Sequence, residues 1–232
     1  MKKKVALVLL VPTIILVSIR CSEASEYFPF QQGSSKEYRT ETKQGDQRIV
    51  ALIKTSVLPK RVFDGQTVAV LKDMMSTIGP SGESFVSYTF YAENDDGLKR
   101  VDIHDPDETT PRKLKREEWQ FKYPLVVGTS WVNYYEIAVS KGKVTVPMTH
   151  TIEKMNDVVT VEAGTFQKCM KIGGYFKGNV NIGSHAGNPE ITIEIHSWYA
   201  PGVGNIKSWF HEKSSKLHWD FKNLTQLKSY AK

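Results

Sequence analysis

The stretch FPFQQGSS at residues 28–35 is matched by the stretch YPLVVGTS at residues 123–130, an offset of 95 residues. Each copy has an aromatic residue, a proline, an apolar residue, two variable residues, a glycine and two hydroxyl residues. Proline fixes an extended approach, and glycine permits a tight turn before a strand begins. The pattern therefore predicts one structural device that is used twice, each time at the start of one of two similar halves.

Outward from these copies, the sequence consists mainly of short runs rich in Val, Ile, Thr, Tyr and Phe, separated by Gly, Pro, Asn or Asp. Ile191, Ile193 and Ile195 alternate with polar residues, which indicates a half-buried strand. Turn residues between other runs predict hairpins that join 84–92 to 98–104, 131–140 to 143–153, and 158–162 to 166–172.

Three further segments are interpreted one by one. A two-residue turn is predicted to join 208–213 to 216–221, which would place Phe210 opposite Trp219 and His211 opposite His218. Residues 65–78 are the place where a short helix is predicted. Residues 105–119 are strongly charged and contain two prolines, so they are predicted to form a solvated connector.

These patterns predict a mainly β fold. We expect a single strongly curved antiparallel sheet or a half-open β-barrel, built from two similar meander halves. The predicted organisation is an export signal at residues 1–24 and a single antiparallel β domain at residues 25–232. Its halves, 25–110 and 120–232, are joined by the charged connector. Each half is small for a core of its own, which favours one shared sheet.

The N-terminus has the features of a bacterial export signal, because three lysines precede an apolar run at residues 5–17. This run is shorter than the roughly 20 residues of a membrane-spanning helix. Cys21 is a candidate lipidation site that would tether the protein to a membrane, although Arg20 stands where such sites have a small residue. Cleavage after Ala24 is the alternative and would remove Cys21. The predicted localisation is accordingly export, either as a periplasmic protein or as a membrane-anchored lipoprotein.

The net charge of +6 belongs largely to this signal, because four of the 31 basic residues lie within the first 20 positions. Without them, 27 basic residues face 25 acidic ones, so nucleic acid is not expected as a partner. Two cysteines exclude a four-cysteine zinc site. Cys169 lies in a strand-like run and is predicted to be a buried apolar residue.

Four motifs stand out together: YFPFQQGSS at 27–35, YPLVVGTSW at 123–131, VEAGTFQKC at 161–169 and WYAPGVGNIK at 198–207. In combination they resemble a broad family of bacterial envelope proteins and lipoproteins, related to the DUF3108 and TapB-like groups. The resemblance implies an antiparallel β fold with a curved, half-open barrel similar to that of periplasmic lipoprotein carriers. It implies no enzymatic residues.

A search for reaction chemistry finds no nucleophile elbow, phosphate-binding loop or dinucleotide fingerprint. The predicted cross-strand pair of His211 and His218 is the most metal-like arrangement, but no third and fourth ligand accompany it. We therefore expect no cofactor and no enzymatic activity, and a metal-dependent hydrolase is the least favoured alternative.

Aromatic residues gather in the last third of the chain, where most are expected to fill the core. Some are candidates for lining a cavity in the mouth of the barrel, and these are Trp198, Tyr199, Trp209, Phe210 and Trp219. Two functions from different classes remain open. The protein binds a lipid, another apolar ligand or a partner segment in its curved sheet, or it is a structural module whose barrel is filled by side chains.

Overall fold

The computed structural model describes residues 23–78, 82–104, 113–139, 142–182 and 187–232, so most of the predicted export signal, with Cys21, lies outside the described residues. In this part of the chain one short helix, α1 (Glu23–Tyr27), precedes twelve strands. The strands are β1 (Ser35–Gln44), β2 (Gln47–Phe63), β3 (Gln66–Thr77), β4 (Ser84–Asn94), β5 (Gly97–His104), β6 (Lys113–Lys122), β7 (Ser130–Val139), β8 (Gly142–Val161), β9 (Gly164–Asn179), β10 (Glu190–Ala200), β11 (Gly204–Ser214) and β12 (Trp219–Ala231).

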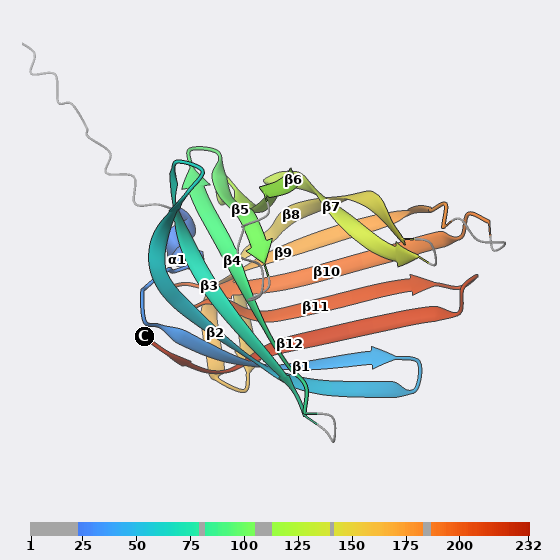
Figure 1. The fold of residues 1–232 in the computed structure, drawn as a ribbon, viewed down its shortest axis with the longest axis horizontal. Coiled ribbons are helices and arrows are strands. Elements are labelled where there is room, and N and C mark those ends of the chain that lie inside the picture. The colour runs from blue at the N-terminus through green and yellow to red at the C-terminus, as the bar shows by residue number, and fades with distance from the viewer. Residues whose placement is uncertain (1–22, 79–81, 105–112, 140–141, 183–186) are drawn as a thin grey trace, which may run out of the picture.

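All twelve strands belong to one antiparallel sheet, in the order β6-β5-β4-β3-β2-β1-β12-β11-β10-β9-β8-β7 (Figure 1). The sheet curls until its two edge strands, β6 and β7, approach each other. The result is a sheet that is nearly closed into a barrel and has one unsealed seam. The predicted fold class, a strongly curved antiparallel sheet made of two meanders, is confirmed.

The two meanders, β1–β6 and β7–β12, begin with the same hairpin. Ser35 pairs with Ser56 in the first hairpin, and Ser130 pairs with Thr151 in the second, so both partners are shifted by 95 positions. β1 and β7 are also equally long, at 10 residues each. The repeat predicted from the two short stretches therefore extends through a complete pair of strands.

The turn before each hairpin makes the same backbone hydrogen bonds. Gly33 has φ +85° and donates its amide to the Val57 carbonyl at 3.0 Å. Gly128 has φ +94° and donates its amide to the Ile152 carbonyl at 2.9 Å. Both glycines adopt a backbone conformation that L side chains disfavour, which explains why both copies carry glycine.

Two junctions join the meanders, and they differ. At the first, which we call the laddered junction, β1 pairs with β12 along its whole length, from Ser35 to Gln44. At the second, which we call the seam, β6 and β7 are neighbours without a described strand pairing. In a six-plus-six meander these junctions are equivalent, because each brings the first strand of one half to the last strand of the other.

One end of the barrel is filled by aromatic side chains from α1 and the segment that follows it. The Phe28 ring lies 5.1 Å from Tyr91 and 5.9 Å from Phe121, measured between ring centroids. Tyr27 and Leu125 are buried in the same cluster. In the described part of the chain, no helix has the length and apolar character needed to cross a membrane.

Three local predictions differ from the strands that form. Residues 65–78 form β3 rather than a helix, since the run Val68, Ala69, Val70 and Leu71 is buried on both faces and shows no polar alternation. The second part of the predicted connector belongs to β6, while residues 105–112 lie outside the described residues. Residues 143–153 and 158–162, predicted as separate strands, form the single strand β8, whose pairing with β9 is interrupted by bulges.

The predicted turn between β11 and β12 is also wrong, because it has four residues rather than two. Ser214 pairs with Trp219, so Phe210 lies opposite Asn223 and His211 lies opposite Lys222. His218 stands in the turn with φ +50°. The two histidines therefore do not form a cross-strand pair.

Candidate functional site

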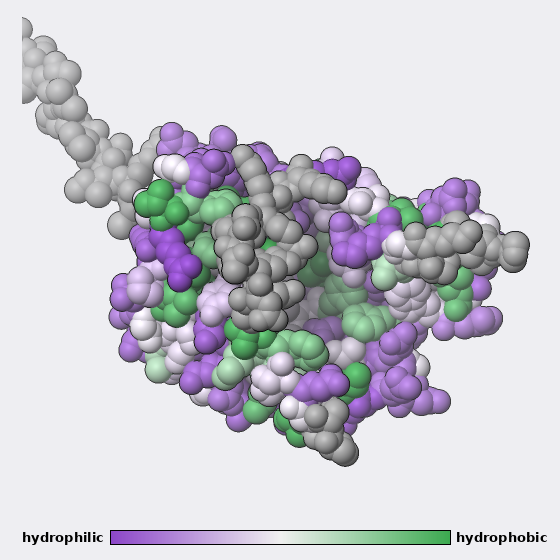
Figure 2. All heavy atoms as spheres, in the orientation of Figure 1, coloured by the Kyte–Doolittle hydropathy of each residue, from purple (hydrophilic) through white to green (hydrophobic). Residues whose placement is uncertain are grey.

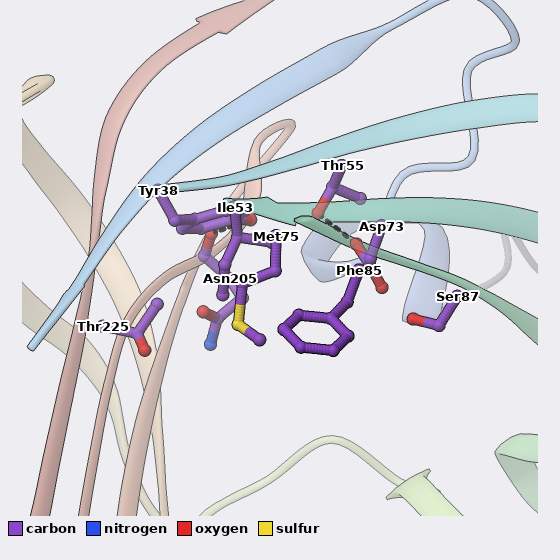
Figure 3. Close-up of a pocket in the computed structure, with 9 residues that line it drawn as sticks. All are labelled: Tyr38, Ile53, Thr55, Asp73, Met75, Phe85, Ser87, Asn205 and Thr225. Atoms are coloured by element: carbon purple, nitrogen blue, oxygen red, sulfur yellow. Dashed lines mark hydrogen bonds between the residues drawn. The ribbon is translucent and has the colours of Figure 1, made fainter. Parts of the chain in front are cut away.

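A cavity of about 390 Å³, the large cavity, lies beside the laddered junction (Figure 3). Its walls come from the first four strands and from the last two, which are consecutive in the sheet because β1 pairs with β12 (Figure 1). The lining residues are Tyr38, Ile53, Thr55, Asp73, Met75, Phe85, Ser87, Asn205 and Thr225.

One row of lining residues is apolar, and the pairing register of the strands places its side chains next to one another. Tyr38 pairs with Ile53, Ile53 with Met75, and Met75 with Phe85. Residues that are directly opposite in neighbouring strands point to the same face, so these four side chains form a continuous row across β1–β4. Phe85 is 53% exposed, so the row reaches solvent at its β4 end.

The neighbouring row of the lining is polar. Thr55 pairs with Asp73, and Asp73 pairs with Ser87. Thr55 donates its hydroxyl to Asp73 Oδ1 at 2.5 Å, as the dashed line in Figure 3 shows. Burial raises the pKa of the Asp73 carboxyl, while the Thr55 hydrogen bond and the charge of Lys36 act in the opposite direction. The cavity thus places one carboxyl beside an apolar wall.

Tyr38 fixes the wall at the laddered junction. It is buried, and its hydroxyl donates to the Asn205 carbonyl at 3.0 Å. Burial raises the pKa of this phenol, so it stays protonated. On the neighbouring strand, Thr225 donates its hydroxyl to Thr40 Oγ1 at 2.9 Å. These hydrogen bonds join β1 to β11 and β12 in the wall of the large cavity and leave the cavity itself open.

Lys36 lies next to the polar row but does not line the cavity. Its backbone pairs with Thr55, and its ammonium nitrogen stands over the Phe28 ring, 6.0 Å from the centroid. Burial lowers the pKa of Lys36 to about 8, although the charge of Asp73 acts to raise it.

Figure 2 shows a hollow near the centre of one face of the molecule. Apolar side chains lie beside this hollow, and polar side chains cover much of the outer edge of the face.

A second cavity of about 140 Å³, the small cavity, lies behind the seam. Trp131 and His150 stack in its wall, with centroids 5.8 Å apart and an interplanar angle of 11°. Burial lowers the pKa of His150 to about 4. Gln120 donates its amide to the Tyr199 hydroxyl at 2.6 Å, and burial raises the pKa of Tyr199 to about 12.

The seam is bridged by side chains that take the place of a strand ladder. The Asn133 amide donates to the Trp119 carbonyl at 2.9 Å and accepts from the Trp119 amide, also at 2.9 Å. Trp131 Nε1 donates to the same carbonyl at 3.1 Å. A carboxamide has the donor and acceptor of a peptide group, so Asn133 pairs with Trp119 as a neighbouring strand residue does.

The five aromatic residues predicted as cavity candidates are placed in three different environments. Tyr199 lines the small cavity. Phe210 and Trp219 pack against a buried cluster that contains Ile191 and Ile193. The other two, Trp198 and Trp209, lie on the outer face of the sheet, opposite to the face of Phe210. Trp198 packs there against a buried cluster that contains Val159 and Cys169.

The outer-face tryptophans contact charged and aromatic side chains of the protein itself. Trp198 donates its indole N–H to Asp157 Oδ2 at 3.1 Å, and the ammonium groups of Lys171 and Lys207 lie 5.4 Å and 5.2 Å from its ring. Trp209 stacks on His196 with centroids 5.5 Å apart. Their ring faces are therefore covered by neighbouring side chains.

Cys169 is fully buried, as its strand context predicts, and burial raises the pKa of its thiol to about 11. His211 Nε2 lies 2.8 Å from Asp220 Oδ1 and has no second histidine opposite. Among the residues that the structure describes, no group of three or more His, Cys, Asp or Glu side chains could hold a metal ion.

Sequence reasoning missed the large cavity because its lining residues are individually ordinary. Thr55, Asp73 and Ser87 lie in three separate strands, and only their register brings them into one row. The repeat could have placed part of the lining, since it fixes the β1–β2 register and therefore the face on which Tyr38, Ile53 and Thr55 lie.

No family model matches the chain, and no curated protein matches it either. Two crystal structures are similar in their fold. One is a protein from Bacteroides fragilis described as exported and as having a YmcC-like fold, with 13% identity, a TM-score of 0.48, and coverage of 91% of this chain and 100% of that chain. The other is a protein from Parabacteroides distasonis described as a lipoprotein, with 13% identity, a TM-score of 0.44, and coverage of 89% and 98%. At these values, neither similarity carries an argument about function.

Proposed function

We propose that the chain is an exported, non-enzymatic protein of the bacterial cell envelope that holds the apolar part of a small molecule in the large cavity. The export signal in the sequence supports the location. The volume of about 390 Å³ and the apolar row with a few polar groups beside it support the binding role, because small-molecule sites have this size and composition. The cavity is the observation that carries the proposal.

The alternative is a structural module whose interior is filled by side chains. It is favoured by the aromatic cluster that fills the α1 end and by the small size of the cavity behind the seam. The two proposals differ in one respect, which is whether the large cavity holds a ligand. The resemblance to the DUF3108 and TapB-like groups is compatible with both.

A neutral, apolar fluorescent probe, N-phenyl-1-naphthylamine, separates the two functions. We expect saturable binding with one site per protein, because the large cavity reaches solvent at Phe85. Native mass spectrometry of protein purified from its own envelope is expected to show a co-purified small molecule. An absence of saturable probe binding would favour the structural module.

A cavity-filling variant tests whether the probe occupies this site. Ser87→Phe places a ring in the cavity, so we expect the probe affinity to fall about tenfold or more. Ser84→Phe is the matched control, because Ser84 lies on the same strand, is exposed, and points to the opposite face. Equal affinities in the two variants would place the probe elsewhere.

A further inference from the structure

The large cavity carries a single charge. Of its nine lining residues, Asp73 is the one with an ionisable carboxyl, and none has a basic side chain. The carboxyl lies at the end of the cavity formed by Thr55, Phe85 and Ser87 (Figure 3). Ile53, Met75 and Tyr38 lie toward the other end (Figure 3). The site is therefore apolar along most of its length and negative at one end.

Asp73 has few partners of its own. Among the described residues, Thr55 alone donates a hydrogen bond to it, and this bond occupies Oδ1. The other carboxyl oxygen points toward the side of Phe85 and Ser87 (Figure 3). Lys36 is the basic residue that acts on Asp73 electrostatically, but its ammonium group is held over the Phe28 ring. One carboxyl oxygen thus remains available to a ligand.

A half-buried carboxylate in this position favours a ligand that brings a positive charge. Burial removes part of the hydration of the charged form, which is why the pKa of Asp73 is raised. A ligand that covers the cavity removes more water, and this costs free energy unless the ligand donates to the carboxylate. An ammonium group supplies charge-assisted hydrogen bonds, whereas a ligand carboxylate at the same place is repelled.

We propose that the ligand of the large cavity is a cationic amphiphile, with an ammonium group beside Asp73 and an apolar body against Ile53, Met75 and Phe85. This inference rests on the proposed function, since it names the class of ligand for the same cavity.

Three probes of equal chain length test the charge preference: dodecylamine, dodecanol and dodecanoate, each used below its micelle concentration to displace N-phenyl-1-naphthylamine at pH 7. We expect dodecylamine to bind about tenfold more tightly than dodecanol, because its ammonium group forms a charge-assisted hydrogen bond with the Asp73 carboxylate and the neutral hydroxyl does not. Dodecanoate is expected to bind most weakly. Equal affinities of the amine and the alcohol in the unmodified protein would overturn the inference.

Asp73→Asn is expected to bring the affinities for dodecylamine and dodecanol within about threefold of each other, since the amide carries no charge. Asp46→Asn is the control with the same change of charge, at an exposed position in the turn between β1 and β2. It is expected to keep the preference for the amine. A preference that survives in Asp73→Asn would also overturn the inference. Failure of the probe and all three amphiphiles to bind would instead overturn the proposed function.

Discussion

The two junctions between the meanders are equivalent in the repeat but are built differently. At the laddered junction, β1 and β12 pair through their backbones over ten residues of β1. At the seam, the Asn133 and Trp131 side chains bond to the backbone of a single residue, Trp119. One junction is thus a continuous strand ladder, and the other is bridged by side chains, which also include the Arg116 guanidinium 4.4 Å from the centroid of the Tyr134 ring.

The residues at equivalent positions explain the difference. Tyr38 in β1 corresponds to Asn133 in β7, 95 positions later. Tyr38 reaches past β12 to the Asn205 carbonyl in β11, whereas the Asn133 amide substitutes for a backbone partner. The same hairpin therefore borders a strand ladder in one half and a side-chain closure in the other.

The two cavities also differ, and each lies beside one of the two junctions. The large cavity lies against the laddered junction, where the backbone ladder holds the wall and side chains leave space. The small cavity lies behind the seam, where Trp119, Trp131 and His150 occupy the interior. The side chains that close the seam thus also line the small cavity, which is the smaller of the two.

Among substitutions at the seam, Trp131→Ala is expected to cause the largest loss of stability. Trp131 is 6% exposed, stacks on His150 and donates to Trp119, so its removal leaves a cavity and takes away one of the two side-chain hydrogen bonds to the Trp119 carbonyl. We expect a loss of about 3–5 kcal/mol in the free energy of unfolding, measured with urea. Lys36→Ala, at the equivalent position of β1, is expected to cost at most about 1 kcal/mol. Comparable losses in both variants would contradict a special role of the seam.

The strand pattern and the repeat made the fold predictable. The period-two alternation at Ile191–Ile195 and the glycine turns before each half indicate antiparallel hairpins, and the equal spacing indicates two meanders. The same reasoning failed at β3, since a strand that is buried on both faces has no alternating pattern to detect.

The candidate site was less predictable, because it depends on contacts between distant strands. Aromatic density pointed to Trp198 and Trp209, but the pleat directs both to the outer face. Tyr199, one position after Trp198, points inward and lines the small cavity. Inward and outward faces are fixed by register and bulges, such as the one between Trp198 and Tyr199, which residue composition does not encode.

Acid is expected to weaken the seam more than the laddered junction, through His150. Because its folded-state pKa of about 4 lies below the ordinary value of 6.5, the stability that it contributes is present above pH 6.5 and is lost as pH falls toward 4. We expect about 2–3 kcal/mol of this stability to be lost between pH 7.5 and pH 4.5. The equivalent residue of the first half is Thr55, which has no charge to gain in this range.

The measurement is urea unfolding at both pH values for the unmodified protein, His150→Gln and His218→Asn. The pH-dependent loss is expected to shrink by this amount in His150→Gln. It is expected to persist in His218→Asn, where an exposed turn histidine is replaced. An unchanged pH dependence in His150→Gln would show that another group is responsible.

A milder break of the seam is Asn133→Leu, which keeps the size of the side chain and removes both hydrogen bonds to Trp119. The Trp119 amide loses its partner, so we expect a loss of about 2 kcal/mol. Tyr38→Phe, at the equivalent position, removes the single hydrogen bond to Asn205 and is expected to cost about 1 kcal/mol. Hydrogen exchange of the Trp119 amide is expected to accelerate only in Asn133→Leu. Retained protection of that amide would mean that it has another acceptor.

The smallest effect is expected in the turns that precede the two hairpins, where the two halves have the same structure. Gly33→Ala and Gly128→Ala each place a Cβ at positive φ, and at neither position does the added atom meet another atom within 4 Å. The cost is therefore conformational strain alone, about 1 kcal/mol in each variant. Because the φ values and the amide hydrogen bonds are the same in kind, the two losses are expected to agree within about 0.5 kcal/mol. A clearly larger loss for Gly128→Ala would show that strain at the turn spreads into the seam, which the continuous ladder beside Gly33 resists.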